Sequence, residues 1–554
     1  MLSLRLRLPL HGLLSFLLVV APLSLNAQTK KPAAPKIKLV LGIVIDQFRY
    51  DYLTRFEDQF GVGGFKRFLQ GGAVFSNAHY PYTPTVTACG HAVFMSGSAP
   101  NENGIIANEW WDRETGKRIT SVSDPNTKLL GGKEGTGASP HRMLSSTIGD
   151  QLKMQTAGQS KVIGISLKDR AAILPAGKKP NGAYWYDTTT GRMISSTYYF
   201  PDLPAWVKKF NQDNCADKYF GKKWEKLLPE AAYARSLPDD SPFEKWPYGK
   251  TFPHTINGGE DKPGSKFYNQ FEATPFANEM LANLAKAAIE NEQLGADDIP
   301  DVLTVSFSAN DILGHYLGPN SPEVQDMTIR TDQILADFLA FVDKKVGLQN
   351  TIIAFTADHG VAPVPEQAQT FGLGGRMEVK EVTEAINNAL NKQFGEEKWI
   401  ASIVYGNVYF DYAALERRKA SRVVAERVAS EAIKKLKGIA ECFTRTEILS
   451  GQLPHTRLAE SVALGFNAER NGDLVAVPKP FWVFGEGSLM ATTHGSPYSY
   501  DTHVPVIFYG AGVKAGLFTN LSSPLDIAPT LAAILKIEQP SNSIGQILSE
   551  AIKK

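Results

Sequence analysis

Short apolar runs alternate with amphipathic stretches along most of this chain. The apolar runs are rich in β-branched residues, as buried strands are, and cover residues 37–45, 161–167, 302–307, 351–355, 481–484 and 504–509. Apolar residues recur with helical spacing over residues 143–156, 276–293, 322–346, 379–394, 412–436 and 524–535. This alternation predicts the α/β class, with a mixed, mostly parallel central sheet and helices on both faces.

Two stretches interrupt the alternation. Residues from about 175 to 272 are rich in Pro, Gly, Trp, Tyr and Lys and show few clean periodicities, which favours an insertion standing over the sheet edge. Residues from about 365 to 480 have helix and strand patterns of their own and form a second expected insertion. We therefore expect residues 37–554 to form a single domain that carries these two insertions.

The N-terminal region has the pattern of a secretory signal peptide. Arg5 and Arg7 precede an apolar run at residues 13–20, and Ala27 stands at a suitable cleavage point. The alternative, a retained membrane anchor, is less favoured because the apolar run is short for crossing a bilayer. We expect a signal peptide at residues 1–27, a flexible leader at 28–36, a periplasmic or secreted protein, and no stable membrane span after cleavage.

Composition excludes some classes of protein. The 554 residues are 43% hydrophobic and 21% charged, which leaves ample material for a core, and the formal net charge of +1 argues against a nucleic-acid-binding module. The three cysteines are too few for a disulfide framework, and because their number is odd at most one disulfide could form within the chain.

Acidic residues and histidines stand at the predicted carboxyl ends of three buried strands, and one further histidine stands shortly before the last strand. These residues are Asp46, Asp311, His315, Asp358, His359 and His494. An isolated acid after a strand is usually a turn or N-cap residue, so none of them is specific alone. The carboxyl ends of such strands meet at one sheet edge, where all six side chains can converge. Three carboxylates and three imidazoles suit two zinc-like ions, which about 4 Å apart could clamp an in-line displacement at phosphorus.

A candidate nucleophile lies at the start of a helix-compatible stretch. Thr87 is a poor nucleophile unless a metal or a base lowers the pKa of its hydroxyl, so a position beside a cation would make chemical sense. Without the predicted ligands, a simple N-cap would be the better interpretation. Cys89 is a rival nucleophile, but no Pro and Arg follow it at the Cys-x-Pro-x-Arg spacing of sulfatases.

In these motifs the chain resembles the alkaline phosphatase superfamily. It is most similar to the secreted bacterial alkaline phosphatases with a threonine nucleophile, the phosphate-irrepressible and sphingomonad kind, and the matches run in order from Asp46 to His494. The resemblance implies a monomer with two zinc ions, one held by Asp311, His315 and His494 and the other by Asp46, Asp358 and His359. It also implies that Thr87 is transiently phosphorylated and that the phosphoryl oxygens are bound by Asn108, Lys168 and Arg170.

The expected function is hydrolysis of small phosphate monoesters through a phosphothreonine intermediate. Lys168 and Arg170 follow a predicted strand at i, i+2 spacing, which would point both to one side if the strand continued. A fork of donors beside a point charge suits a dianionic phosphate. The nearest alternative is a nucleotide pyrophosphatase or phosphodiesterase of the same superfamily. A cell-wall phosphotransferase and, from another class, a non-catalytic phosphate-binding protein also stay open.

Overall fold

The computed structural model describes residues 36–213, 215–485 and 490–553. The expected signal peptide and almost all of the expected leader lie outside the described residues. Among the described helices, none combines the length and the apolar character that crossing a membrane would need.

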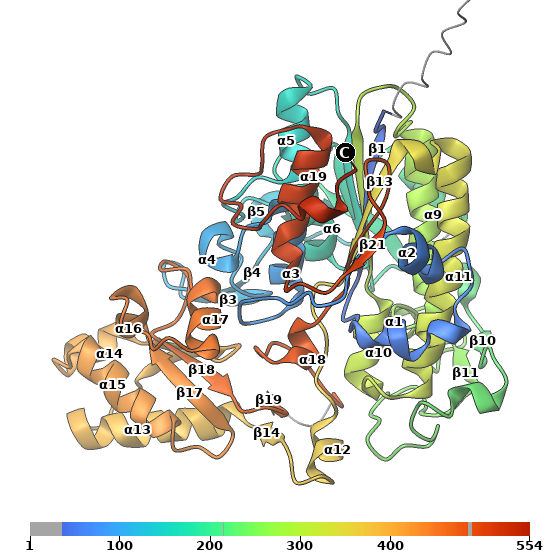
Figure 1. Cartoon of the computed structure of the whole chain (residues 1–554). Helices are drawn as coiled ribbons and strands as arrows, with labels where there is room; N and C mark the ends of the chain where they lie inside the picture. The colour runs from blue at the N-terminus through green and yellow to red at the C-terminus, as the bar shows by residue number, and fades with distance from the viewer. Residues whose placement is uncertain (1–35, 214, 486–489, 554) are drawn as a thin grey trace, which may run out of the picture. The chain divides into compact units, whose positions relative to one another are not determined.

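A central sheet organises the described chain (Figure 1). In order across the sheet, its eleven strands among the described residues are β21 (Gly516–Phe518), β2 (Ala73–Phe75), β20 (Val506–Gly510), β13 (Thr351–Thr356), β1 (Leu39–Ile45), β12 (Asp301–Phe307), β7 (Val162–Ser166), β8 (Gly182–Asp187), β9 (Arg192–Ser196), β5 (Ser123–Leu130) and β6 (Thr136–Ala138). The strands from β13 to β8 run parallel, whereas β20 is antiparallel to β13. The predicted α/β class with a mixed sheet is confirmed.

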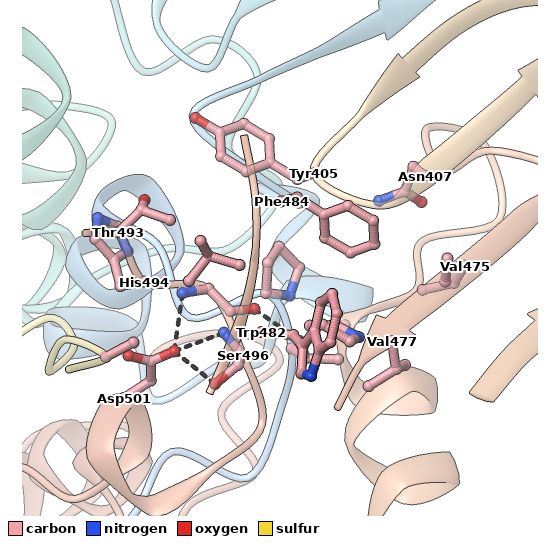
Figure 2. A pocket seen from close by; sticks show the side chains of 18 of the residues that line it. Tyr405, Asn407, Val475, Val477, Trp482, Phe484, Thr493, His494, Ser496 and Asp501 are labelled. Atoms are coloured by element: carbon pink, nitrogen blue, oxygen red, sulfur yellow. Dashed lines mark hydrogen bonds between the residues drawn. The ribbon is translucent and has the colours of Figure 1, made fainter. Parts of the chain in front are cut away.

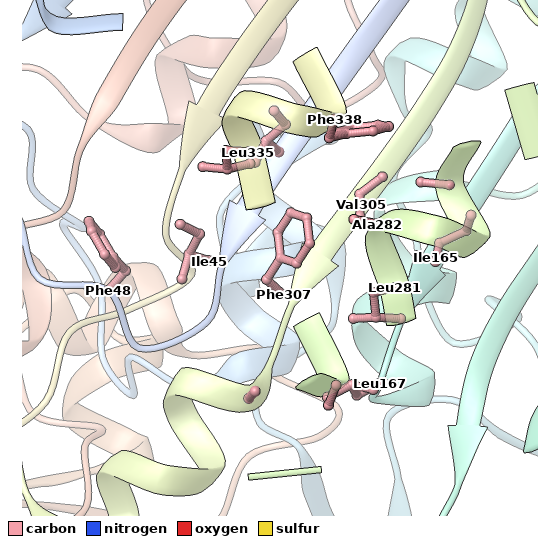
Figure 3. Close-up of a cluster of buried hydrophobic side chains, with 14 of the residues drawn as sticks. Ile45, Phe48, Ile165, Leu167, Leu281, Ala282, Val305, Phe307, Leu335 and Phe338 are labelled. Atoms are coloured by element: carbon pink, nitrogen blue, oxygen red, sulfur yellow. The ribbon is translucent and has the colours of Figure 1, made fainter. Parts of the chain in front are cut away.

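Helices cover both faces of this sheet. They are α9 (Pro275–Asn291) and α11 (Pro322–Lys345) on one face, and α3 (Thr87–Ser96), α6 (Asp169–Ala176) and α19 (Ile527–Leu535) on the other. Successive side chains of β1 alternate between the two layers, so Ile43 joins the core with α9 and α11 while Val44 joins the core with α3 and α19. Figure 3 shows the first of these cores, in which Phe307 of β12 lies near Leu281 of α9 and Leu335 of α11.

The first stretch expected as an insertion contributes to the sheet itself. Within it, β8 pairs in parallel with β7, and β8 and β9 form an antiparallel pair. The aromatic residues Tyr184, Trp185 and Tyr186 of β8 are buried core residues rather than cover for the sheet edge. Further along, β10 (Lys222–Trp224) and β11 (His254–Ile256) pair in a small sheet of their own.

The second stretch builds a separate sheet with its own core. The four antiparallel strands are β15 (Ile400–Val404), β16 (Asn407–Phe410), β18 (Leu474–Pro478) and β17 (Ile439–Thr444), packed against α13 (Val379–Phe394) and α15 (Arg422–Ile433). Trp399 and Phe410 lie in this core. The run predicted at 481–484 forms β19 (Trp482–Phe484), which pairs with β14 (Gly375–Met377) and not with the central sheet.

Two predicted helices differ in extent from the sequence pattern. The helix expected at 143–156 is α5 (Ile148–Gln155), which begins late because Thr147 and Asp150 form a capping box at its N-terminus. The helix expected at 412–436 is divided into α14 (Tyr412–Arg417) and α15, because Lys419 between them has a φ of 51° and cannot continue a right-handed helix.

Candidate active site

The carboxyl ends of three parallel strands bring the predicted ligands together. Asp46 directly follows β1, Asp358 and His359 follow β13, and α10 (Ala309–Leu317), which follows β12, carries Asp311 and His315 one turn apart. Side-chain donor atoms form two groups, in each of which all three atoms lie within 4.8 Å of one another. The groups are Asp311, His315 and His494, and Asp46, Asp358 and His359. These are the same two sets that the sequence resemblance implies, and either could hold a metal ion.

Each of the three histidines is oriented by a backbone carbonyl. The Nδ1 atoms of His315, His359 and His494 lie 2.9 Å from the carbonyl oxygens of Thr492, Gly360 and Thr85, respectively. A hydrogen bond donated from Nδ1 fixes the tautomer, so Nε2 carries the free lone pair. This arrangement is typical of histidines that bind a metal through Nε2.

The Nε2 atoms face the carboxylates of the site. His494 Nε2 and His315 Nε2 lie 3.5 and 3.3 Å from Asp311 Oδ1, and His359 Nε2 lies 3.5 Å from Asp46 Oδ1. Burial lowers the pKa values of His359 and His494, which favours the neutral ring that a metal requires.

The carboxylates carry more buried negative charge than the protein itself neutralises. Asp46 Oδ1 and Asp358 Oδ2 are buried and have no hydrogen-bond partner. Burial and, for Asp46, the nearby charges of Asp311 and Asp358 raise the pKa of Asp46 to about 8, and burial raises that of Asp358 to about 7. Lys168 is paired with Asp46 at 2.7 Å and with Asp311. Unpartnered carboxylate oxygens next to neutral imidazoles form a donor set that fits divalent cations.

Thr87 lies at the edge of this donor set. It is the first residue of α3 and is buried, and its Oγ1 lies 3.4 Å from His359 Nε2 and 3.5 Å from Lys168 Nζ. Gly90 makes this approach possible, because a Cβ at that position would lie 2.2 Å from the carbonyl oxygen of Asp358. His91 bridges the Thr87 carbonyl oxygen and the Ser306 hydroxyl at 2.8 Å each and so connects α3 to β12.

The rival nucleophile Cys89 faces away from this centre. Its thiol is fully buried and donates to the carbonyl oxygen of Ile105 at 3.1 Å. Burial raises the pKa of the thiol, which disfavours the reactive thiolate. Cys215 and Cys442 are likewise buried and free, so the single disulfide that the sequence allowed is not formed.

Asn108 and Lys168 contact the first residues of α3, and Arg170 follows Lys168 closely in the chain. The Asn108 side-chain oxygen accepts a hydrogen bond from the backbone N–H of Ala88 at 2.8 Å, so its amide nitrogen is the end turned outward. The sequence analysis considered a continuation of strand β7 through Lys168 and Arg170, but the strand ends before them. Lys168 is the N-cap of α6 and Arg170 stands in its first turn, because β7 ends at Ser166. The two cations are therefore placed by a helix start and not by strand alternation.

Three further residues of the site had no clear signal in the sequence. Gln47 joins both ligand groups, since its backbone N–H donates to Asp358 Oδ1 at 3.0 Å and its side-chain amide to Asp311 Oδ1 at 2.7 Å. Tyr405 comes from the second sheet, and its hydroxyl accepts a hydrogen bond from Asn108 Nδ2 at 3.2 Å. Burial raises the pKa of Glu272 to about 7, against the opposing charges of nearby Lys168 and Arg170. Only the adjacency of Gln47 to Asp46 could have indicated any of them.

Comparisons with known proteins agree with this geometry. Residues 40–500 match the family described as type I phosphodiesterase / nucleotide pyrophosphatase. A protein of Myroides odoratus named calcium-transporting ATPase is 39% identical over 94% of this chain and 95% of its own length. Alkaline phosphatase PafA of Elizabethkingia meningoseptica is 38% identical over 95% of this chain and 96% of its own length.

The fold comparison leads to the same group of enzymes. The crystal structure of wild-type alkaline phosphatase PafA superposes with a TM-score of 0.88 at 38% identity and covers 94% of this chain and 100% of that chain. The resemblance inferred from the motifs is therefore confirmed. This protein belongs to the type I phosphodiesterase / nucleotide pyrophosphatase family, within the alkaline phosphatase superfamily.

Proposed function

We propose that this protein is a phosphomonoesterase of the alkaline phosphatase kind, which transfers the phosphoryl group of its substrate to Thr87 and then to water. The observation that carries the proposal is the position of Thr87 Oγ1, 3.4 Å from His359 Nε2 and 3.5 Å from Lys168 Nζ. A hydroxyl held between a ligand group and a cation is placed for activation as a nucleophile. The relatives named alkaline phosphatase support the same assignment.

We assign two zinc ions to the two ligand groups. Asp46, Asp358 and His359 would hold one ion, and Asp311, His315 and His494 the other. When bound, such ions supply positive charge that lowers the pKa of a neighbouring hydroxyl and stabilises anionic oxygens. Mixed carboxylate and imidazole ligands, with no cysteine in either group, suit Zn²⁺ in sites that keep a position open for substrate.

The position of Thr87 relative to the two ligand groups gives the direction of the proposed phosphoryl transfer. Thr87 Oγ forms a bond to phosphorus while the ester P–O bond breaks on the opposite side, so the alcohol departs away from Thr87. Thr87 borders the group that contains His359, and the departing oxygen therefore lies toward the group that contains His494. Water then attacks the phosphothreonine, which releases inorganic phosphate and restores the hydroxyl.

Asn108, Lys168 and Arg170 are proposed to hold the non-bridging phosphoryl oxygens. The outward amide of Asn108, the ammonium of Lys168 and the guanidinium of Arg170, whose Nε is buried without a hydrogen-bond partner, can donate to a compact dianion. A monoester offers more charged oxygens than a diester, so these three donors favour the monoester.

A diesterase is the second candidate because the family model carries that name. Because one relative is named calcium-transporting ATPase, ATP is also worth testing as a substrate. The terminal phosphoryl group of ATP is as highly charged as that of a phosphate monoester. ATP hydrolysis at Thr87 would be the same phosphoryl transfer and would not by itself indicate transport.

The deciding experiment measures kcat/KM of the zinc-loaded protein on matched aryl phosphate monoester and diester substrates. We expect a strong monoester preference, and an Arg170→Ala variant should lose at least about tenfold more activity on the monoester than on the diester. Arg427→Ala, which changes an exposed arginine of the second sheet region, is the matched control. A diester preference in the wild type, or equal losses in Arg170→Ala, would contradict the monoesterase assignment.

We also propose that the protein acts outside the cytoplasm, as a monomer. The signal-peptide pattern at residues 1–27 supports export, and the monomer follows from the resemblance to the bacterial alkaline phosphatases. N-terminal sequencing of the exported protein should begin at Gln28, and light scattering should give the mass of one chain. A retained N-terminus or a dimer mass would contradict these two expectations.

A further inference from the structure

A cavity adjoins the site on the side of the second sheet. It lies between the β15–β16 turn, strands β18 and β19, and the segment that carries His494 (Figure 2). Among the described residues, the side chains that shape it include Tyr405, Val475, Val477, Trp482, Phe484 and His494. The wall formed by the second sheet region is therefore mainly aromatic and aliphatic.

The cavity borders the ligand group that contains His494. His494 lines it and also belongs to the ligand group with Asp311, opposite to the group that Thr87 borders. Tyr405 lines it too, and its hydroxyl accepts a hydrogen bond from Asn108, a proposed phosphoryl-binding residue. His494 and Tyr405 therefore connect the lining of this cavity to the proposed ligand and phosphoryl-binding residues.

The backbone at Tyr405 is unusual for a tyrosine. Tyr405 and Gly406 form a two-residue turn between β15 and β16, with φ values of 49° and 76°. Turns with two positive φ values favour Asn, Asp and Gly, so the backbone of a tyrosine there is strained. The residue nevertheless remains 40% exposed, so little packing offsets this strain. A ring that is held in this way is available to a ligand.

The charges of the cavity restrict the kind of alcohol. Among the described residues, its ionisable lining consists of His494 and Asp501, apart from tyrosines. Asp501 Oδ2 already accepts hydrogen bonds from the backbone N–H groups of Gly495 and Ser496 and from the Ser496 hydroxyl. No lysine or arginine is among these lining residues, although Lys437 Nζ lies 5.8 Å from the centroid of the Trp482 ring. A flat apolar alcohol could contact the rings of Tyr405 and Trp482.

We propose that this cavity binds the alcohol half of the phosphate monoester and selects aromatic alcohols over small aliphatic ones. The inference rests on the proposed phosphomonoesterase function. It identifies Tyr405 and Trp482 as residues that determine specificity without taking part in the bond changes.

The test compares 1-naphthyl phosphate with ethyl phosphate in wild type, Trp482→Ala, Trp482→Phe and Tyr405→Asn. Asparagine suits a positive φ and so removes the ring without adding strain. Each variant is expressed relative to wild type on the same substrate, so that the intrinsic reactivity of the ester cancels. We expect Trp482→Ala to lower kcat/KM for the naphthyl ester about tenfold and for the ethyl ester less than twofold, with Trp482→Phe close to wild type. Because Tyr405 also contacts Asn108, Tyr405→Asn should lower kcat/KM for both esters, and more for the naphthyl ester.

Calorimetry with phenylphosphonate and methylphosphonate gives a readout without turnover. The wild type should bind the phenyl compound more tightly, and Trp482→Ala should lose that difference. Phe371→Ala, at a phenylalanine that is 77% exposed and outside the cavity, is the matched control. Equal losses on both esters, or an unchanged aryl preference, would overturn the inference alone. A wild type that cleaves neither monoester would instead overturn the proposed function.

Discussion

At the scale of single residues, removing the hydroxyl of Thr87 distinguishes Thr87 from Cys89 as the candidate nucleophile. Removing it in Thr87→Ala should lower kcat by on the order of a thousandfold or more, because the variant lacks the oxygen proposed to form the covalent intermediate. The dissociation constant of inorganic phosphate, measured by calorimetry, should change only a few-fold, since the anion donors remain.

The matched control is Cys89→Ala, on the same helix. Its thiol points to the Ile105 carbonyl oxygen and not into the site, so kcat should stay within about twofold of wild type. A Thr87→Ala enzyme with most of its kcat, or an inactive but folded Cys89→Ala enzyme, would remove Thr87 from the nucleophile role.

A second residue-scale prediction concerns Glu244, which lies away from the metal ligands. Both of its carboxylate oxygens are buried without a hydrogen-bond partner. Burial, with the nearby acids Glu323, Asp239 and Asp240 outweighing Lys250, raises the pKa of Glu244 from 4.5 to about 9. The folded state therefore holds this proton more tightly than the unfolded state. The resulting stability is complete below about pH 4.5 and is lost as the pH rises toward about 9.

Glu244→Gln should remove this loss of folding stability at rising pH, because an amide does not titrate. The melting temperature of the variant relative to wild type should increase from pH 6 to pH 9, as measured by calorimetry in low-salt buffers. Glu384→Gln, at an exposed carboxylate, should show no such trend. If the difference in melting temperature between variant and wild type stayed constant from pH 6 to pH 9, Glu244 would not hold its proton in the folded state.

At the scale of elements, the contact of α3 with the β13 carboxyl end decides where Thr87 lies. In Gly90→Ala the new Cβ would meet the backbone of Asp358 at 2.2 Å, and backbone cannot yield locally. We expect α3 to shift, a loss of about 1–3 kcal/mol of stability, and a large fall in kcat. Unfolding by denaturant and steady-state kinetics measure the two effects.

Gly42→Ala, on β1, provides the comparison at another contact of α3. Its Cβ would lie 2.4 Å from Met95 Cε and 2.9 Å from Phe94 Cε1, which are side-chain atoms and not backbone. This variant should therefore keep most of its activity even if it loses some stability. If Gly90→Ala were as active as Gly42→Ala, the close approach of α3 to Asp358 would not be what positions the nucleophile.

At the scale of the whole molecule, the proposed ions connect strands that are far apart in the sequence. Without cations, the carboxylates of Asp46, Asp311 and Asp358 share a buried site in which Lys168 pairs with Asp46 and Asp311. Removing metal with a chelator should abolish activity and lower the melting temperature by several degrees, because ions that bind only the folded state stabilise it. Adding Zn²⁺ should restore both, and native mass spectrometry should count two ions. Full activity in metal-free protein would contradict the two-ion site.

The sequence by itself determined the class of the fold and most of the site. Continuous apolar runs rich in β-branched residues, such as those of β1 and β12, favour buried parallel strands, whose carboxyl ends share one edge of the sheet. The positions of Asp46, Asp311 and Asp358 in the chain therefore already allowed the prediction that they meet. The same local reasoning failed at Arg170, where a helix start replaces the expected strand.

Tertiary structure alone decided what approaches the site from elsewhere. Tyr405 stands more than 230 residues from Lys168 in the chain, and only the folding of the second sheet places its hydroxyl against Asn108. Local patterns report which face of an element is buried, but they carry no information about which distant element covers it. For this reason the chemistry at phosphorus could be predicted from the sequence, whereas the cavity proposed to select the alcohol could not.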